Sequence, residues 1–114
     1  MKELNRLVGA GGENQACQYL KNKKYIIEKT NFKTNVGEID IVARQGRTIV
    51  FVEVKKRETL VYGRPSEAVD QRKQNKIRST AQLYLLKNKL ASSPVRFDVI
   101  EIIGENINHI ENAF

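Results

Sequence analysis

The chain has 114 residues with 40% hydrophobic and 29% charged side chains, which fits one folded domain and excludes a disordered or fibrous chain. Its single cysteine excludes an internal disulfide, and with no apolar run of signal-peptide or membrane-spanning length we expect a cytoplasmic protein without a membrane partner. The 20 Lys and Arg residues against 13 Asp and Glu give a net charge of +7, which favours an extended anion such as nucleic acid as the partner.

The first half of the chain predicts one helix and three strands. Apolar residues recur every three or four positions over residues 3–23, as on the buried stripe of a helix. The glycines of segment 9–12 cost roughly 1 kcal/mol each in a helix relative to alanine, so the helix is expected to bend there or to begin after them. The predicted strands are 25–32, 36–43 and 48–55. The short connection that contains Gly46 predicts a hairpin between the second and the third.

The second half predicts a loop, a second helix and two strands. A polar loop is expected over 57–65, after which Ser66 is placed to cap a helix that runs to about residue 89. The apolar residues at helical spacing along it are Val69, Ile77, Ala81, Tyr84 and Leu85. The last two predicted strands are 95–103 and 107–111, on either side of a turn.

These elements follow the order α-β-β-β-α-β-β, and we predict a single α/β domain over residues 1–114. The second helix separates the third strand from the fourth, which permits a parallel crossover between them. The remaining connections favour antiparallel pairing. The expected architecture is a mixed sheet flanked by two helices.

Three charged residues on the second and third predicted strands are the strongest functional signal. Glu53 and Lys55 are two residues apart and therefore project from one face of a strand whose preceding residues, 49–52, are all apolar. The predicted hairpin brings Asp40 near Glu53. Two carboxylates and an ammonium group then share one small site, an arrangement that can hold a hard divalent cation and orient water at a phosphodiester.

Other interpretations of these acidic residues stay open at this point. Asp40 would be an ordinary surface residue if one face of its strand is solvated. Glu53 and Lys55 could form a structural ion pair. Glu13 falls on the apolar side of the first helix, beside Ala16, so that either a cation compensates its charge or the helix dipole stabilises a partly solvated carboxylate.

Basic residues on the second helix and on the preceding loop are candidate nucleic-acid contacts. Lys73 lies on the apolar stripe of the helix, so its ammonium group is expected to reach toward an acidic group or a phosphate. The neighbouring helical candidates are Arg72, Lys76 and Arg78, and the loop candidates are Lys56, Arg57 and Arg64. A solvated cationic surface is the alternative for all of them except Lys73.

For three further residues the sequence predicts structural roles only. Cys17 is expected to be a small buried apolar residue. His109 has no second His or Cys nearby in sequence to complete a zinc site, and Tyr84 falls at core spacing on its helix.

The ordered set Glu13, Asp40 and Glu53-Val54-Lys55 resembles the PD-(D/E)xK nuclease superfamily, with Ile39 at the position of the proline. Longer strings extend the resemblance over essentially the whole chain: Gly12-Glu13, Gly37-Glu-Ile-Asp-Ile-Val-Ala43, Phe51-Val-Glu-Val-Lys55, Arg96-Phe-Asp-Val-Ile100 and Asn112-Ala-Phe114. On these strings the chain resembles the YraN-like family of small bacterial proteins, predicted nucleases similar to archaeal Holliday-junction resolvases.

The resemblance implies a restriction-endonuclease-like core and a set of roles. Asp40 and Glu53 would bind Mg²⁺ or Mn²⁺ together with the Val54 carbonyl, Glu13 would complete the acidic cluster, and Lys55 would assist the attacking water or stabilise the transition state. The leading hypothesis is a metal-dependent DNA endonuclease, with branched or junction DNA and a two-fold homodimer as its implied substrate and assembly. The alternatives are a non-catalytic nucleic-acid-binding module and an interaction domain with a structural ion-pair network.

Overall fold

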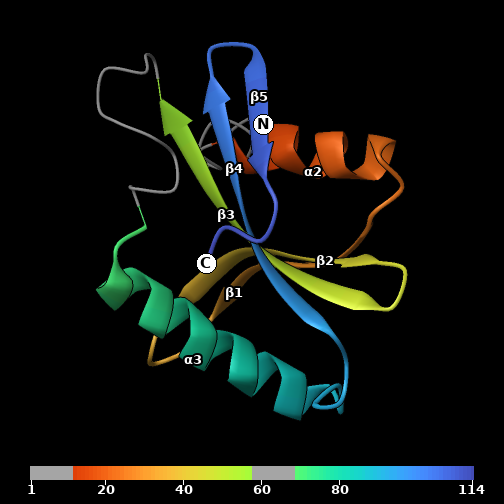
Figure 1. Cartoon of the computed structure of the whole chain (residues 1–114), viewed down its shortest axis with the longest axis vertical. Helices are drawn as coiled ribbons and strands as arrows, with labels where there is room; N and C mark the ends of the chain where they lie inside the picture. Colours follow the sequence, from red (N-terminus) through yellow and green to blue (C-terminus); the bar gives the residue numbers. More distant parts are fainter. Residues whose placement is uncertain (1–11, 58–68) are drawn as a thin grey trace, which may run out of the picture.

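The computed structural model describes residues 12–57 and 69–114 of the chain. It confirms the predicted α/β order α-β-β-β-α-β-β, consistent with a restriction-endonuclease-like core (Figure 1). The elements are α2 (Glu13–Asn22), β1 (Ile26–Lys33), β2 (Glu38–Gln45), β3 (Thr48–Arg57), α3 (Gln71–Lys87), β4 (Val95–Ile103) and β5 (Asn106–Ile110). In this described part of the chain, neither helix is long and apolar enough to cross a membrane.

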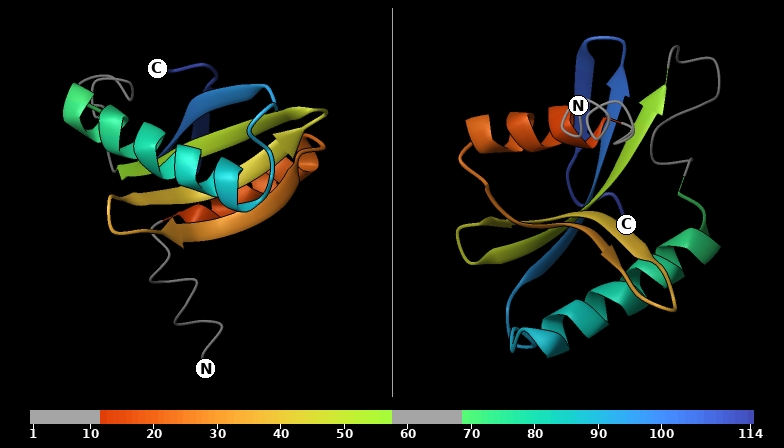
Figure 2. Two further views of the ribbon diagram at one scale, coloured as in Figure 1. Left: turned by 90° about the horizontal axis from the view of Figure 1, so that it is seen from below. Right: turned by 180° about the vertical axis from the view of Figure 1, so that it is seen from behind.

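The five strands form one mixed sheet in the order β1-β2-β3-β4-β5. β3 and β4 are parallel, and every other neighbouring pair is antiparallel. The parallel pair follows from α3, which carries the chain from the end of β3 back to the start of β4, as Figure 2 shows. The predicted crossover and the predicted antiparallel hairpins are therefore confirmed.

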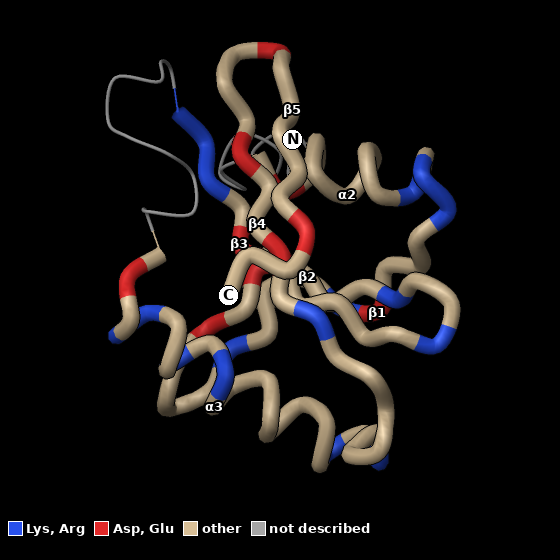
Figure 3. Tube along the Cα trace, in the orientation of Figure 1, with Lys and Arg blue, Asp and Glu red and all other residues tan. Residues whose placement is uncertain are grey.

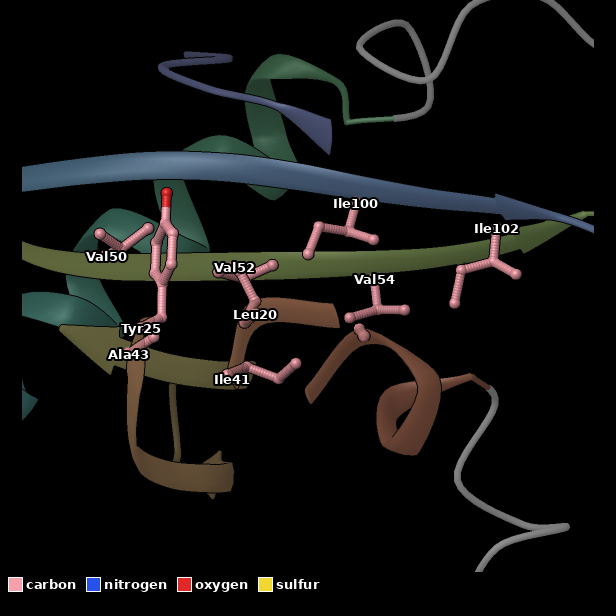
Figure 4. Close-up of a cluster of buried hydrophobic side chains, with 10 residues drawn as sticks. Leu20, Tyr25, Ile41, Ala43, Val50, Val52, Val54, Ile100 and Ile102 are labelled. Carbon is pink, nitrogen blue, oxygen red and sulfur yellow. The ribbon is translucent and has the colours of Figure 1, made fainter. Parts of the chain in front are cut away.

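Each helix covers one face of the sheet, and β3 supplies apolar side chains to both faces. Val50 and Val52 point toward α2, where they pack with Leu20 and Ile100 (Figure 4). Phe51 points toward α3 and packs in the second apolar cluster. Because both faces of β3 are buried, a charged side chain on this strand needs a specific partner. This central position matches the expectation from its apolar sequence.

α2 begins directly after the glycines, which agrees with one of the two expectations, whereas α3 begins later than predicted. α2 begins at Glu13, after Gly12, whose positive φ of 97° suits glycine; residues 3–11 lie outside the described part of the chain. The prediction that the second helix begins after Ser66 is wrong, because α3 begins at Gln71. Its cap is Asp70, whose carboxylate accepts a hydrogen bond from the backbone N–H of Lys73 at 2.9 Å.

Candidate functional site

Asp40 lies at the point where the pairing of β2 with β3 ends. The ladder runs from the hairpin turn as far as Ile41 opposite Val52. One residue beyond, the Oδ2 atom of Asp40 accepts a hydrogen bond from the backbone N–H of Val54 at 2.8 Å. The carboxylate therefore bonds to a backbone group of the neighbouring strand, and this bond fixes its orientation beside the Glu53-Val54 peptide.

Glu53 is a buried carboxylate that faces α3 and two lysines. Its side chain is only 7% exposed, and its Oε1 atom lies 3.5 Å from the Nζ of Lys73 and 3.8 Å from the Nζ of Lys55. The prediction that Lys73 reaches an acidic group is therefore confirmed. Burial, followed by the negative charge of Asp40, raises the pKa of Glu53 to about 7, and the two lysines oppose that rise. The predicted convergence of Asp40, Glu53 and Lys55 is present in the fold.

The raised pKa of Glu53 predicts that this residue destabilises the protein at neutral and alkaline pH. A carboxyl group whose pKa is higher in the folded chain than its ordinary 4.5 favours folding at low pH, and the contribution is lost as the pH rises through about 7. In the presence of EDTA, we therefore expect Glu53→Gln to melt at a higher temperature than the parent at pH 8. The difference should disappear near pH 4. A lower melting temperature for the variant at pH 8 would contradict this account.

Glu13 approaches Asp40 from the α2 side of the sheet, opposite to Glu53. Burial and then the charge of Asp40 raise the pKa of Glu13, while a hydrogen bond with the Asn31 side chain opposes the shift. Among residues 12–57 and 69–114, however, no three His, Cys, Asp or Glu side chains are grouped closely enough to hold a metal ion. Ligand roles for Asp40, Glu53 and Glu13 therefore stay predictions.

A cavity of about 230 Å³ opens above the two carboxylates. Its lining residues are Gly37, Glu38, Asp40, Glu53, Lys73, Lys76 and Ile77. The β1–β2 turn closes one side, where Gly37 packs against α3. A Cβ atom at position 37 would lie 2.9 Å from the Oγ1 of Thr80, so glycine permits the close approach of turn and helix. The site is therefore a small cleft with acidic groups at its base and lysines on its helical wall.

The basic residues predicted on α3 divide between two sides of the helix. Lys73 and Lys76 line the cleft, and both also line an adjacent cavity with Arg72 and Asp70. Arg78 lies two residues beyond Lys76, which is about 200° around a helix. Its guanidinium group stacks over the rings of Phe97 and Phe114, at 5.2 and 5.3 Å from the ring centres. The structure thus separates Arg78 from the other three predicted contacts.

This separation predicts different effects for the substitution of Lys76 and the substitution of Arg78. Lys76→Ala should lower the slope of log affinity for duplex DNA against log salt by about 0.9, because one phosphate contact is lost. Arg78→Ala should leave the slope unchanged and lower the melting temperature, because the aromatic rings lose their cation. Fluorescence anisotropy over a salt series and thermal melts measure both effects. Equal slopes for parent and Lys76→Ala would exclude this side of α3 as the contact surface.

Two of the other predicted cations, Lys56 and Arg57, are the last two residues of β3. Arg57 forms an ion pair with Glu101, its Nε atom 3.1 Å from Oε2 of that fully buried carboxylate. The side chain of Lys56 passes close to Gly12 at the start of α2. Arg64 lies outside the described residues. Sequence reasoning missed Glu101, although its position in an otherwise apolar strand segment, Val99–Ile103, was an available signal.

Asp98 organises a second buried polar cluster, on the α2 face of the sheet. Its carboxylate accepts hydrogen bonds from Arg96 at 2.8 Å and from the backbone N–H of Asn112 at 3.0 Å, and it lies 2.7 Å from Nε2 of His109. The side chain of His109 is 3% exposed, which confirms its predicted structural role. The cluster joins the Arg96-Phe-Asp98 string to the C-terminal Asn112-Ala-Phe114 string.

Comparison with known proteins identifies the family of the chain. The model of the family described as "Uncharacterised protein family UPF0102" matches residues 12–102. A UPF0102 protein of Alkaliphilus oremlandii is 50% identical over 117 residues, covering 97% of this chain and 100% of the relative. A UPF0102 protein of Persephonella marina is 48% identical over 106 residues, covering 93% and 91%. The chain therefore belongs to the UPF0102 family, which is the YraN-like family.

Proposed function

We propose that the chain is a metal-dependent endonuclease that hydrolyses phosphodiester bonds in DNA, at the site formed by Asp40, Glu53 and Lys55. The observation that carries this proposal is the pair of carboxylates at the base of one cleft, with Lys55 Nζ 3.8 Å from Glu53 and with the carboxylate of Asp40 fixed by the N–H of Val54. Two adjacent carboxylates on the neighbouring strands β2 and β3, one of them buried, are unfavourable for folding, which argues for a selected function at this position.

The donor set suits Mg²⁺ or Mn²⁺. Hard divalent cations prefer oxygen ligands, and Mg²⁺ in particular is commonly held by one or two carboxylates together with substrate phosphate and water. Asp40 and Glu53 would supply the carboxylates, with the Val54 carbonyl as a third oxygen. When bound, such a cation polarises the phosphate and lowers the pKa of water. Positive charge between the carboxylates would also return the pKa of Glu53 toward its ordinary range, because it opposes the charge of Asp40.

The two lysines at the site have different surroundings and therefore different proposed roles. Lys55 follows Glu53 on the same face of β3, and its ammonium group is placed to bind the attacking water or a phosphate oxygen as negative charge develops. Lys73 comes from α3 and lines the wall of the cleft, where its ammonium group can bind the phosphate of the incoming strand. Both lysines also compensate the charge of Glu53 before the substrate binds.

Incubation of the purified chain with linear and four-way branched DNA tests the activity. We expect strand cleavage with Mn²⁺ or Mg²⁺ and none in EDTA, with branched DNA cut at least as well as linear DNA. An RNA duplex of equal sequence serves as the comparison for substrate class. Binding of DNA without cleavage under every metal condition would refute the proposed activity.

The alternative is a non-catalytic nucleic-acid-binding module in the cytoplasm. One observation favours it: the ion pairs of Glu53 with Lys55 and Lys73 compensate the buried charge by means of protein groups alone. Under this alternative the basic surface would bind DNA and the acidic site would have no need for a cation.

A charge-neutral substitution of Asp40 separates the two candidates. Asp40→Asn removes one negative charge from the proposed donor pair, and we expect the affinity for Mn²⁺ to fall at least tenfold in a calorimetric titration, since one of only two protein carboxylates is lost. Asp70→Asn, on the exposed first turn of α3, is the matched control and should keep the parent affinity. Unchanged Mn²⁺ affinity in Asp40→Asn would favour the binding module.

A further inference from the structure

A second cavity lies at the end of β3 opposite to the acidic cleft. It has a volume of about 390 Å³ and lies between the β2–β3 turn and the loop from α3 to β4, with Arg47, Ser92, Ser93 and Pro94 as its lining residues. The backbone N–H of Ile49 donates a hydrogen bond to the carbonyl of Pro94 at 2.8 Å and holds the loop beside the strand. One guanidinium group and two hydroxyl groups around an open cavity are donors that suit a phosphate.

Further cations surround this end of the molecule. The last turn of α2 carries Lys21, and the segment between α2 and β1 carries Lys23 and Lys24, all of them exposed. Ile26 pairs with Arg44, so this segment runs beside the β2–β3 turn. Figures 1 and 3 show the end of α2 and that turn on one side of the molecule, with Lys and Arg gathered on both.

Acidic neighbours neutralise only part of this charge. Glu28 lies 3.2 Å from Arg44, and Glu111 lies 3.3 Å from Arg96, so each is already engaged. Within residues 12–57 and 69–114, Arg47 forms no ion pair with an acidic side chain. The guanidinium group of Arg47 is therefore available for an external anion.

We propose that this far-end surface, defined as Arg47, Ser92, Ser93 and the lysines at 21, 23 and 24, binds the phosphate backbone of a DNA duplex whose scissile phosphate lies in the acidic cleft. The proposal rests on the proposed function for its substrate class. Arg47 precedes Glu53 by six residues, nearly all within β3, which corresponds to about 20 Å along an extended strand. At 3.4 Å per base pair, this is about six base pairs of duplex.

A nucleic-acid backbone explains the arrangement better than a small anion does. The cations come from two separate segments, the β2–β3 turn and the end of α2 with the residues after it, and they extend beyond the cavity, as a polyanion requires, whereas a free phosphate would use only the cavity itself. The helix α3 has 17 residues, about 25 Å in length, and lies between the cleft at its first turns and the far-end loop after its last turn. Phosphates at both ends would then fix the register of the duplex on the protein.

Stem-loop DNAs with stems of 4 to 16 base pairs test the proposal by fluorescence anisotropy in EDTA, which prevents metal-dependent cleavage. For the parent, affinity should rise at least tenfold once the stem is long enough to extend about six base pairs beyond the cleft. Arg47→Gln with Lys24→Asn should remove this rise and lower the salt slope by about 1.8, which is two contacts at about 0.9 each. Asparagine is used at position 24 because Lys24 has a φ of 72°, which asparagine tolerates.

The control variant also removes two positive charges, but from outside the far-end surface. Lys29→Gln with Lys56→Gln changes two exposed lysines that line neither cavity, so it should retain the rise in affinity with stem length even if overall binding weakens. A rise that is absent in the parent, or that survives in the Arg47 and Lys24 variant, would overturn the proposal. So would calorimetric binding of inorganic phosphate at Arg47 without any effect of the variant on DNA, which would identify a small-anion site. Because the measurement is of binding, absence of cleavage would refute the proposed function and leave this test intact.

Discussion

Lys55→Ala should lower the rate of DNA cleavage by about 100-fold to 10,000-fold, the range expected when a group that acts on the transition state is removed. The melting temperature and the affinity for DNA should change little. The side chain of Lys55 is 26% exposed, and Lys73 still neutralises Glu53 in its absence. An interaction made mainly in the transition state affects the rate far more than the binding of the substrate.

Lys56→Ala is the matched control for this substitution. It removes the same charge from the next residue of β3, which points to the other face of the sheet, near Gly12. Single-turnover cleavage with saturating Mn²⁺ measures the chemical step, and anisotropy measures binding. If Lys55→Ala cleaves as fast as the parent, Lys55 has no role in catalysis. If it loses affinity and rate together, the ammonium group acts in substrate binding.

Asp98→Asn should lower the free energy of unfolding by about 3 to 5 kcal/mol, because it removes the buried carboxylate that pairs with the Arg96 guanidinium and that lies 2.7 Å from Nε2 of His109. Asp98 is fully buried, and its carboxylate accepts hydrogen bonds from Arg96 and from the backbone N–H of Asn112 and contacts His109. Its loss therefore affects β4, β5 and the C-terminal segment at once. Urea denaturation at pH 7 measures the effect, with Glu105→Gln on the exposed β4–β5 turn as a control that should match the parent.

The same substitution has a defined pH dependence. Burial alone would raise the pKa of Asp98, but the hydrogen bonds from His109, Arg96 and Asn112 together outweigh burial and lower it below the ordinary 3.8. A carboxylate with a lowered pKa stabilises the fold above pH 3.8, and this contribution is lost as the pH falls through the pKa of the folded state. The difference between parent and Asp98→Asn should thus be largest near neutral pH and shrink below pH 4. A difference that stays constant from pH 7 to pH 3 would contradict the assignment.

Local sequence pattern determined the elements and the central acidic motif of this protein. Successive side chains of a strand point to opposite faces of the sheet. An apolar run followed by Glu53 and Lys55, two residues apart, therefore indicates a central strand with charge on one face. The hairpin at Gly46 follows from turn chemistry and brings Asp40 to Glu53. These features depend on residues close together in the chain, for which spacing predicts geometry.

Only the tertiary structure decided which distant residues meet. His109 contacts Asp98 because β4 and β5 pair in one register, and Arg47 shares a cavity with Ser92 because α3 returns the chain to that end of the sheet. α3 begins at Gln71, where the Asp70 carboxylate caps the helix, and not after Ser66, the cap that the sequence predicted. Helical spacing puts Lys76 and Arg78 on opposite sides of α3, but which side faces the cleft and which faces the rings of Phe97 and Phe114 depends on how α3 packs on the sheet. Packing and register over long chain separations carry no local sequence signal, and they place the cations around the acidic site.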